Sequence, residues 1–259
     1  MTRFKKFHGT SMKSLMALAI GVSLSIAAAP ASKAAEDGLS AVQKKQVEEL
    51  VQKYILEHPE IIIQAVQSMQ ARQEQEKKAR AQAALKEYKQ ELEADPDTPV
   101  LGNPVGKVTV VEFFDYRCGY CKRVFPSIMK VMKDDPNVRY VFKEFPILGP
   151  ESVVASRAAI AVWRTRKEKY GAFHAALMSA KGGIPEARVL KIAEGLGIDP
   201  KNLKTAMGDS AIDRILERNY RLAQNLDING TPAFVIGGKL VPGAIDLQTM
   251  KKMIAEAGS

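Results

Sequence analysis

The chain has 259 residues, enough for one or two domains with a hydrophobic core, and its composition is that of an ordinary globular protein. Its formal net charge is +9, but five basic residues and no acidic residue lie within the first 35 positions, so the remainder carries only +4. That balance is a weak basis for a nucleic-acid partner, and none is expected.

The first 35 residues have the pattern of a cleavable export signal. A basic start (residues 3–13) is followed by an apolar run (residues 15–29) and then by small residues (32–35), with cleavage expected after Ala34 or Ala35. A membrane anchor is the alternative, but about fifteen apolar residues fall short of the ~20 that a spanning helix needs. The sequence therefore predicts an exported protein whose mature chain begins near residue 36.

Residues 36–98 predict an N-terminal helical region. An amphipathic helix ends near His58, and Pro59 suits the first turn of the next helix. From Met69 to Leu92 the sequence is almost entirely Gln, Glu, Lys, Arg and Ala, which predicts one long solvated helix of ~50 Å. The apolar start of this region needs a partner, so we interpret the region as an oligomerisation stalk. A helix folded back on its own domain and a frayed linker are the alternatives, and the apolar pattern is too short to specify a dimer or a trimer.

Residues 99–259 predict a second domain in which strands flank a block of helices. Residues 107–114 and 138–145 are rich in β-branched and aromatic side chains, and a helix to about residue 134 separates them. Strand–helix–strand order implies a right-handed crossover and a parallel pair. Residues 151–227 have helical patterns throughout, with Trp163 and His174 expected in the core. Two strands joined at Gly237-Gly238 and a last helix capped by Asp246 follow. This order predicts an α/β thioredoxin fold with an all-helical insertion at about residues 150–227.

The only two cysteines, Cys118 and Cys121, lie between the end of the first long predicted strand and the start of the helix that follows it. Unpaired backbone N–H groups and the helix dipole favour an anion there, and a thiolate is the useful one. A disulfide within so short a loop would brace little of the fold. Zinc normally takes four Cys or His ligands, and His174 is the only histidine in this domain. The pair therefore favours a redox site over a zinc site or a structural disulfide.

A second motif, Gly230-Thr231-Pro232-Ala233-Phe234, lies at the start of a late strand. An X–Pro bond at that place is a candidate cis-proline, which would bring Thr231 beside the cysteine loop. From the residues alone, the cis form is the minority expectation, because few X–Pro bonds in folded proteins adopt it.

The segment from Phe113 to Cys121, the helical block and the Thr231-Pro232 motif together resemble the DsbA family of periplasmic thiol–disulfide oxidoreductases over about residues 100–259. Residues 48–61 further resemble the ScsC or Com1-like branch of that family, in which a helical region precedes the DsbA-like domain and some members are trimeric isomerases. The resemblance implies a periplasmic location, with an outer-membrane association as an alternative, and a homo-oligomer with a trimer favoured. It implies no cofactor and no metal.

The resemblance also assigns roles to individual residues. It implies that Cys118 is the exposed nucleophile and Cys121 the buried resolving thiol, and that Pro232 is the cis-proline. Thr231, the residue before it, would pair through its backbone with a bound substrate strand. Glu112 resembles a buried acid that assists proton transfer to and from Cys121.

Two further residues have less direct counterparts in the family. Lys143 is expected to be the partner of Glu112. Gly119-Tyr120 stands between the cysteines where the strongly oxidising members have Pro-His, and this pair is found in the family's disulfide isomerases. Gly119 and Tyr120 are expected beside the bound substrate, together with Thr231 and Pro232.

The expected function is a periplasmic disulfide isomerase or reductase that acts on exported proteins with cysteines or disulfides through the Cys118–Cys121 redox pair. Isomerisation requires the reduced dithiol, which implies a membrane thiol reductase of the DsbD or ScsB kind as partner. A monomeric dithiol oxidase is the first alternative. A protein that binds Cu(I) through its two thiolates, with a role in copper tolerance, is an alternative of another class.

Overall fold

The computed structural model describes residues 38–258. The predicted export signal lies outside the described residues. The chain divides into two compact units, one ending at Ile63 and the other beginning at Gln64, and each is described by itself. Among the described residues, no helix is long and apolar enough to span a membrane.

The first unit consists of α1 (Ala41–Glu57) and the start of α2 (Glu60–Glu87). Ser40 caps α1 through a reciprocal pair of hydrogen bonds with Gln43, which satisfies free N–H groups of the first turn. No residue of α1 is buried. Large apolar side chains of this unit are exposed instead: Leu39, Val42, Val47, Leu50, Val51, Tyr54, Leu56, Ile62 and Ile63. The amphipathic helix is therefore present as predicted, with its apolar side chains in solvent.

The second unit contains the rest of α2, which gives way at Tyr88 to the short helix α3 (Lys89–Glu93). The prediction of one continuous solvated helix to Leu92 was wrong at its end. Leu85 and Leu92 are only 6% and 2% exposed, because they pack into a cluster with strand residues such as Val111 and Phe113. Two leucines in a run of polar helix formers were thus the contact points with the sheet.

Five strands form one sheet in the order β1-β3-β2-β4-β5. Their bounds are β1 Val100–Gly102, β2 Val108–Phe114, β3 Val138–Glu144, β4 Ala233–Ile236 and β5 Lys239–Pro242. β2 and β3 are parallel, as predicted, and the other pairs are antiparallel. The hairpin at Gly237-Gly238 is also confirmed, and both glycines have the positive φ that such a turn requires. The short strand β1 was not predicted from its turn-rich sequence.

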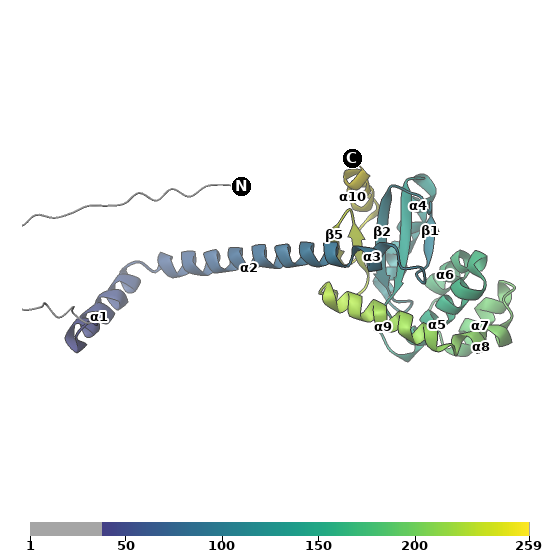
Figure 1. Ribbon diagram of the computed structural model, residues 1–259, viewed down its shortest axis with the longest axis horizontal. Helices are drawn as coiled ribbons and strands as arrows, with labels where there is room; N and C mark the ends of the chain where they lie inside the picture. The colour runs from purple at the N-terminus through teal and green to yellow at the C-terminus, as the bar shows by residue number, and fades with distance from the viewer. Residues whose placement is uncertain (1–37, 259) are drawn as a thin grey trace, which may run out of the picture. The chain divides into compact units, whose positions relative to one another are not determined.

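Helices cover both faces of this sheet (Figure 1). Successive residues of a strand point to opposite faces, so Val110 and Phe114 of β2 join one cluster while Val111 and Phe113 join the other. The first cluster packs under α4 (Gly119–Asp134) and α10 (Leu247–Gly258), and the second under α3 and α9 (Ser210–Asn225). Asp246 caps α10 as expected, by accepting a hydrogen bond from the Thr249 N–H at 2.8 Å.

The segment between β3 and β4 is entirely helical, which confirms a thioredoxin fold with an all-helical insertion. Trp163 and His174 lie in its core as predicted. Its helices are α5 Pro150–Thr165, the 3-10 turn η1 Lys167–Lys169, α6 Tyr170–Ser179, α7 Glu186–Gly195, α8 Pro200–Met207 and then α9.

Candidate active site

The two cysteines lie at the junction of β2 and α4, where the sequence placed them. Cys118 is the N-cap residue of α4, and its sulfur accepts a hydrogen bond from the Cys121 N–H at 3.4 Å. Both cysteines are free thiols in this structure, and both are buried. The expectation of an exposed Cys118 was wrong, because only 5% of this residue is exposed, although it is less enclosed than Cys121 at 0%. The four N–H groups of a helix's first turn have no partner within the helix, so this position stabilises negative charge on the Cys118 sulfur.

Thr231 and Pro232 form the opposite side of the site, and the peptide bond between them is cis. The antiparallel pairing of β4 with β2 brings this bond beside Cys118. The Cys118 Sγ lies 3.2 Å from the Thr231 carbonyl oxygen and donates to it when protonated. Residues separated by more than a hundred positions in sequence are thereby in direct contact.

The two thiols have opposite acidities. A hydrogen bond from the Cys121 thiol is the main cause that lowers the pKa of Cys118 to about 5. A hydrogen bond with Thr231 and the N–H groups of Cys121 and Tyr120 lower it further, and together these effects outweigh burial. Burial raises the pKa of Cys121 far above its ordinary value, and the neighbouring Cys118 and Glu112 add to that rise. One sulfur is therefore prepared to attack as a thiolate, while the other keeps its proton until it is needed.

Glu112 is fully buried and lies on the same face of β2 as Val110 and Phe114, the face whose hydrophobic cluster includes both cysteines. Burial raises its pKa to about 8, although a hydrogen bond from the Tyr140 hydroxyl to Oε2, at 3.0 Å, acts in the opposite direction. Its other oxygen, Oε1, has no hydrogen-bond partner among the described residues. A carboxyl that titrates near neutral pH and has a free oxygen can exchange a proton with a buried thiol.

The expected pairing of Lys143 with Glu112 was wrong. Lys143 pairs across the sheet with Phe113, and the alternation of side chains along β3 puts it on the face opposite to Glu112. Its Nζ donates to the Glu91 carbonyl at 2.6 Å and to the Thr98 hydroxyl at 2.8 Å, and lies 3.5 Å from Asp95 Oδ2. Tyr140, three residues earlier on β3, holds the position that was expected for Lys143.

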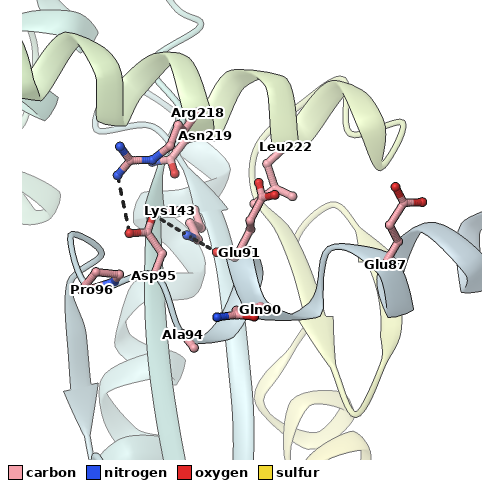
Figure 2. Close-up of a pocket in the computed structure, with 10 residues that line it drawn as sticks. All are labelled: Glu87, Gln90, Glu91, Ala94, Asp95, Pro96, Lys143, Arg218, Asn219 and Leu222. Carbon is pink, nitrogen blue, oxygen red and sulfur yellow. Dashed lines mark hydrogen bonds and ion pairs between the residues drawn. The ribbon is translucent and has the colours of Figure 1, made fainter.

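Lys143 instead lies in a pocket between the α2–α3 segment and α9 (Figure 2). Figure 2 shows Asp95 between the Lys143 ammonium and the Arg218 guanidinium, and Arg218 Nη2 also lies 2.7 Å from Asp97. Burial lowers the pKa of Lys143 to about 8 despite the attraction of Asp95. These contacts fix the segment that leads into β1, on the far side of the sheet from the cysteines.

Asp115 holds the cysteine loop in place. Its Oδ2 accepts hydrogen bonds from the N–H groups of Ile147 and Leu148, at 2.9 and 3.0 Å. Its Oδ1 accepts from the Arg117 N–H and the Ser152 hydroxyl, at 2.7 and 2.8 Å. One buried carboxyl therefore ties the residues before Cys118 to the start of the helical insertion.

The comparisons with known proteins agree with this geometry. Residues 109–255 match the family described as the DSBA-like thioredoxin domain, and residues 43–76 match the copper resistance protein ScsC N-terminal domain. The chain belongs to the DsbA-like thioredoxin family. It is a thiol–disulfide oxidoreductase with an ScsC-type N-terminal region, and the predicted family and enzyme class are confirmed.

Two solved structures show the extent of the similarity. A thioredoxin-like oxidoreductase from Silicibacter pomeroyi is 43% identical and covers 65% of this chain and 96% of its own, with a TM-score of 0.62. A linker-deletion mutant of Proteus mirabilis ScsC is 30% identical and covers 86% of this chain and 98% of its own, with a TM-score of 0.66. The second structure thus extends the similarity into the N-terminal helices.

Among curated relatives, disulfide bond formation protein D of Bacillus subtilis is 28% identical over 169 residues, which are 60% of this chain and 75% of that protein. A Salinispora arenicola protein named as a Na(+)/H(+) antiporter is 29% identical over 175 residues, and the chain spans only a quarter of its length.

The two residues between the cysteines of this DsbA-like site are open to solvent. Tyr120 is 58% exposed, and the Arg123 guanidinium lies 4.9 Å from the centre of its ring. A Cβ atom added at Gly119 would meet no atom within 4 Å, so packing within the chain does not require glycine there. Both positions can therefore contact a bound polypeptide. Sequence reasoning missed Asp115 and Tyr140. Only the pairing of β2 with β3 shows that Tyr140 reaches Glu112, and only the packing of the segment after β3 shows what Asp115 holds.

Proposed function

We propose that this protein is a disulfide isomerase and reductase of the periplasm that acts on exported proteins. The observation that carries the proposal is the reactive sulfur itself. Cys118 has a low pKa, lies at a helix N-terminus and faces the Thr231 carbonyl at 3.2 Å. We assign the Thr231 backbone, which lies beside Cys118, to pair with an extended substrate strand.

The reaction begins when the Cys118 thiolate attacks one sulfur of a substrate disulfide. A mixed disulfide forms, and the other substrate sulfur leaves as a thiolate. In isomerisation, a different substrate thiolate attacks the mixed disulfide, which gives a rearranged substrate and regenerates the Cys118 thiolate. No net electrons are exchanged in this cycle.

In reduction, Cys121 attacks the Cys118 sulfur instead and releases the substrate as a dithiol. The high pKa of Cys121 means that its proton must be removed, and the free Oε1 of ionised Glu112 is the group that we assign to accept it. The resulting Cys118–Cys121 disulfide needs two electrons to return to the dithiol. We assign their supply to a membrane thiol reductase of the DsbD or ScsB kind.

The N-terminal region supports a homo-oligomer, for which we propose a trimer. Val47, Leu50, Val51 and Tyr54 recur at helical spacing on α1 and are 45 to 66% exposed, although an apolar stripe of this kind is normally buried against a partner. Packing of these stripes between copies would leave several Cys118 sites around one bound substrate.

Recovery of activity from scrambled, disulfide-bonded ribonuclease tests the isomerase. The mature reduced protein should restore activity, and Cys118→Ser should not. Failure of the mature protein, together with efficient oxidation of reduced ribonuclease, would overturn the isomerase.

Light scattering tests the assembly. The mature chain should have the mass of a trimer, and a variant lacking residues 36–63, which keeps Leu85, Leu92 and Asp95 in place, should be a monomer. Leu50→Glu should also dissociate the oligomer because it places a charge in the apolar stripe, whereas Gln52→Glu, outside the stripe, is the matched control. A mature chain that is already monomeric would contradict the proposal that the N-terminal region forms an oligomer.

A monomeric dithiol oxidase is the second candidate, and the low Cys118 pKa favours it. A stable thiolate favours the reduced form of the enzyme and so makes its disulfide a stronger oxidant. The reduction potential separates the two functions, since an isomerase must stay reduced beside a reductase.

A further inference from the structure

A basic groove of about 690 Å³ runs beside the cysteine loop. Its walls come from the first turns of α4 and from the loop between α6 and α7. The side chains that matter for its character are Arg117, Lys122, Phe125, Met178 and Lys181. We call this hollow the basic groove.

Most cations of the basic groove have backbone carbonyls, rather than carboxylates, as their partners. Lys122 Nζ donates to the backbone carbonyls of Ala180 and Leu177, and Arg188 donates to those of Lys181 and Gly183. Carbonyl oxygens orient a cation but do not cancel its charge. Burial lowers the pKa of Lys122, the nearby positive charge of Arg188 lowers it further, and the Asp115 carboxylate has a smaller effect in the opposite direction.

Among the described residues, Glu151 is the one carboxylate that forms an ion pair with a cation of the groove. Its Oε2 lies 3.4 Å from Arg117 Nε and accepts a hydrogen bond from the Ile184 N–H at 3.1 Å. Lys181 is exposed, and its side chain has no hydrogen bond or ion pair within the described part of the chain. Lys122, Lys181 and Arg188 therefore leave a concentrated positive potential in the groove.

The basic groove is lined by close chain neighbours of the reactive cysteine. Arg117 precedes Cys118 in the chain, and the Lys122 N–H donates to the Cys118 carbonyl at 3.1 Å. Phe125 and Met178 give the walls an apolar part, while Gly182 and Gly183 leave backbone without side chains at the rim. An extended polypeptide whose cysteine reaches Cys118 can thus lay its neighbouring residues in the groove.

We propose that the basic groove selects substrate polypeptides with acidic side chains within a few residues of the reactive cysteine. This substrate class rests on the proposed thiol–disulfide exchange function. Charge complementarity supplies the preference, because an aspartate or glutamate there meets unneutralised cations, whereas a lysine meets like charge.

The test uses the mature reduced protein and matched peptides with one cysteine, flanked by glutamates, glutamines or lysines. Each cysteine is activated as a mixed disulfide with 4-thiopyridine, a neutral leaving group. The Cys118 thiolate attacks the peptide sulfur, and the S–S bond to the pyridine breaks. The leaving pyridine-4-thiolate takes up a proton to give neutral 4-thiopyridone, which is followed by its absorbance.

We expect the glutamate peptide to react about 10-fold faster than the lysine peptide at low salt, a ratio that shrinks at high salt. Lys181→Glu should reduce the ratio at least about 3-fold, through the loss of one cation and the gain of an anion. The matched control is Lys107→Glu, an exposed position at the other end of β2, and it should leave the ratio unchanged.

Equal rates for the three peptides, with a fast reaction of each, would overturn the groove's role and leave the proposed function intact. No reaction with any peptide or with neutral dithiodipyridine would instead overturn the proposed function. A ratio that falls equally in Lys107→Glu and Lys181→Glu would show a general charge effect, which also overturns the assignment to this groove.

Discussion

Replacing Glu112 by glutamine tests whether a protonated carboxyl lies beneath the cysteines. Glutamine keeps the size of the side chain and an oxygen that can accept from Tyr140, but it cannot ionise. The pKa of Glu112 rises from 4.5 to about 8 on folding, with burial as the main cause. The folded state therefore binds more protons than the unfolded state between these two values, so the contribution of Glu112 to stability falls as the pH rises through that window.

At about 1.36 kcal/mol per pH unit, the wild type should lose about 3 kcal/mol between pH 5 and pH 7.5 that the variant does not lose. The buried glutamine N–H₂ adds a cost of about 1–3 kcal/mol that does not depend on pH, so the change with pH is the informative quantity. Urea unfolding of both reduced proteins at the two pH values measures it, and the difference between them cancels other titrating groups that the substitution leaves unaffected.

A difference between wild type and Glu112→Gln that is the same at both pH values would refute this reasoning. It would mean that Glu112 has the same ionisation in the folded and unfolded states. The proposed role of Glu112 as proton acceptor for Cys121 gives a second expectation. Glu112→Gln should slow the attack of Cys121 on the mixed disulfide and leave the first attack by Cys118 unchanged.

Three more predictions follow from the packing and the charges. Thiolate absorbance of the reduced protein should titrate with a midpoint near pH 5, and Cys121→Ala should move that midpoint upward because the Cys121 hydrogen bond is the largest cause of the low pKa; an unchanged midpoint would contradict this cause. Lys143→Met should lower the free energy of unfolding in urea by about 3 kcal/mol, because it removes an ion-pair partner of the nearly buried Asp95. Adding Asp95→Asn should recover part of that loss. If the losses of the two single variants simply add in the double variant, the two side chains do not interact. Leu92→Ala should cost about 2–5 kcal/mol in the same assay because Leu92 is only 2% exposed, and a loss below about 1 kcal/mol would exclude it from the core.

The redox pair could be identified from the sequence because its geometry is local. Two cysteines three positions apart at a strand-to-helix junction are bound to meet at the helix N-terminus, and the N-cap hydrogen bond from Cys121 to Cys118 is set by that spacing alone. The parallel strand pair, the hairpin and the amphipathic helix of residues 41–57 follow from local patterns in the same way.

The partners of buried side chains could not be read from the chain, because β2 and β3 are covered on both faces. Where both faces are apolar, the alternation of hydrophobic residues gives no sign of which side a residue occupies. The sequence analysis therefore named Lys143 as the partner of Glu112, whereas the register of the strands places Tyr140 there. Leu85 of α2 and Leu92 of α3 were missed for another reason: two isolated leucines among polar helix formers make no apolar face that a sequence pattern could show.

By itself, the sequence determined that two thiols would lie at a helix N-terminus in a thioredoxin-like domain behind a helical region, because these features depend on neighbours a few positions apart. Only the tertiary structure decided that the Thr231 carbonyl faces Cys118 from 113 positions away and that Tyr140 hydrogen-bonds to Glu112. It also brings Lys181 and Arg188, from the loop after α6 and the start of α7, to Lys122 of α4. Contacts of that kind depend on strand register and on how the helical insertion packs, and no local pattern encodes either.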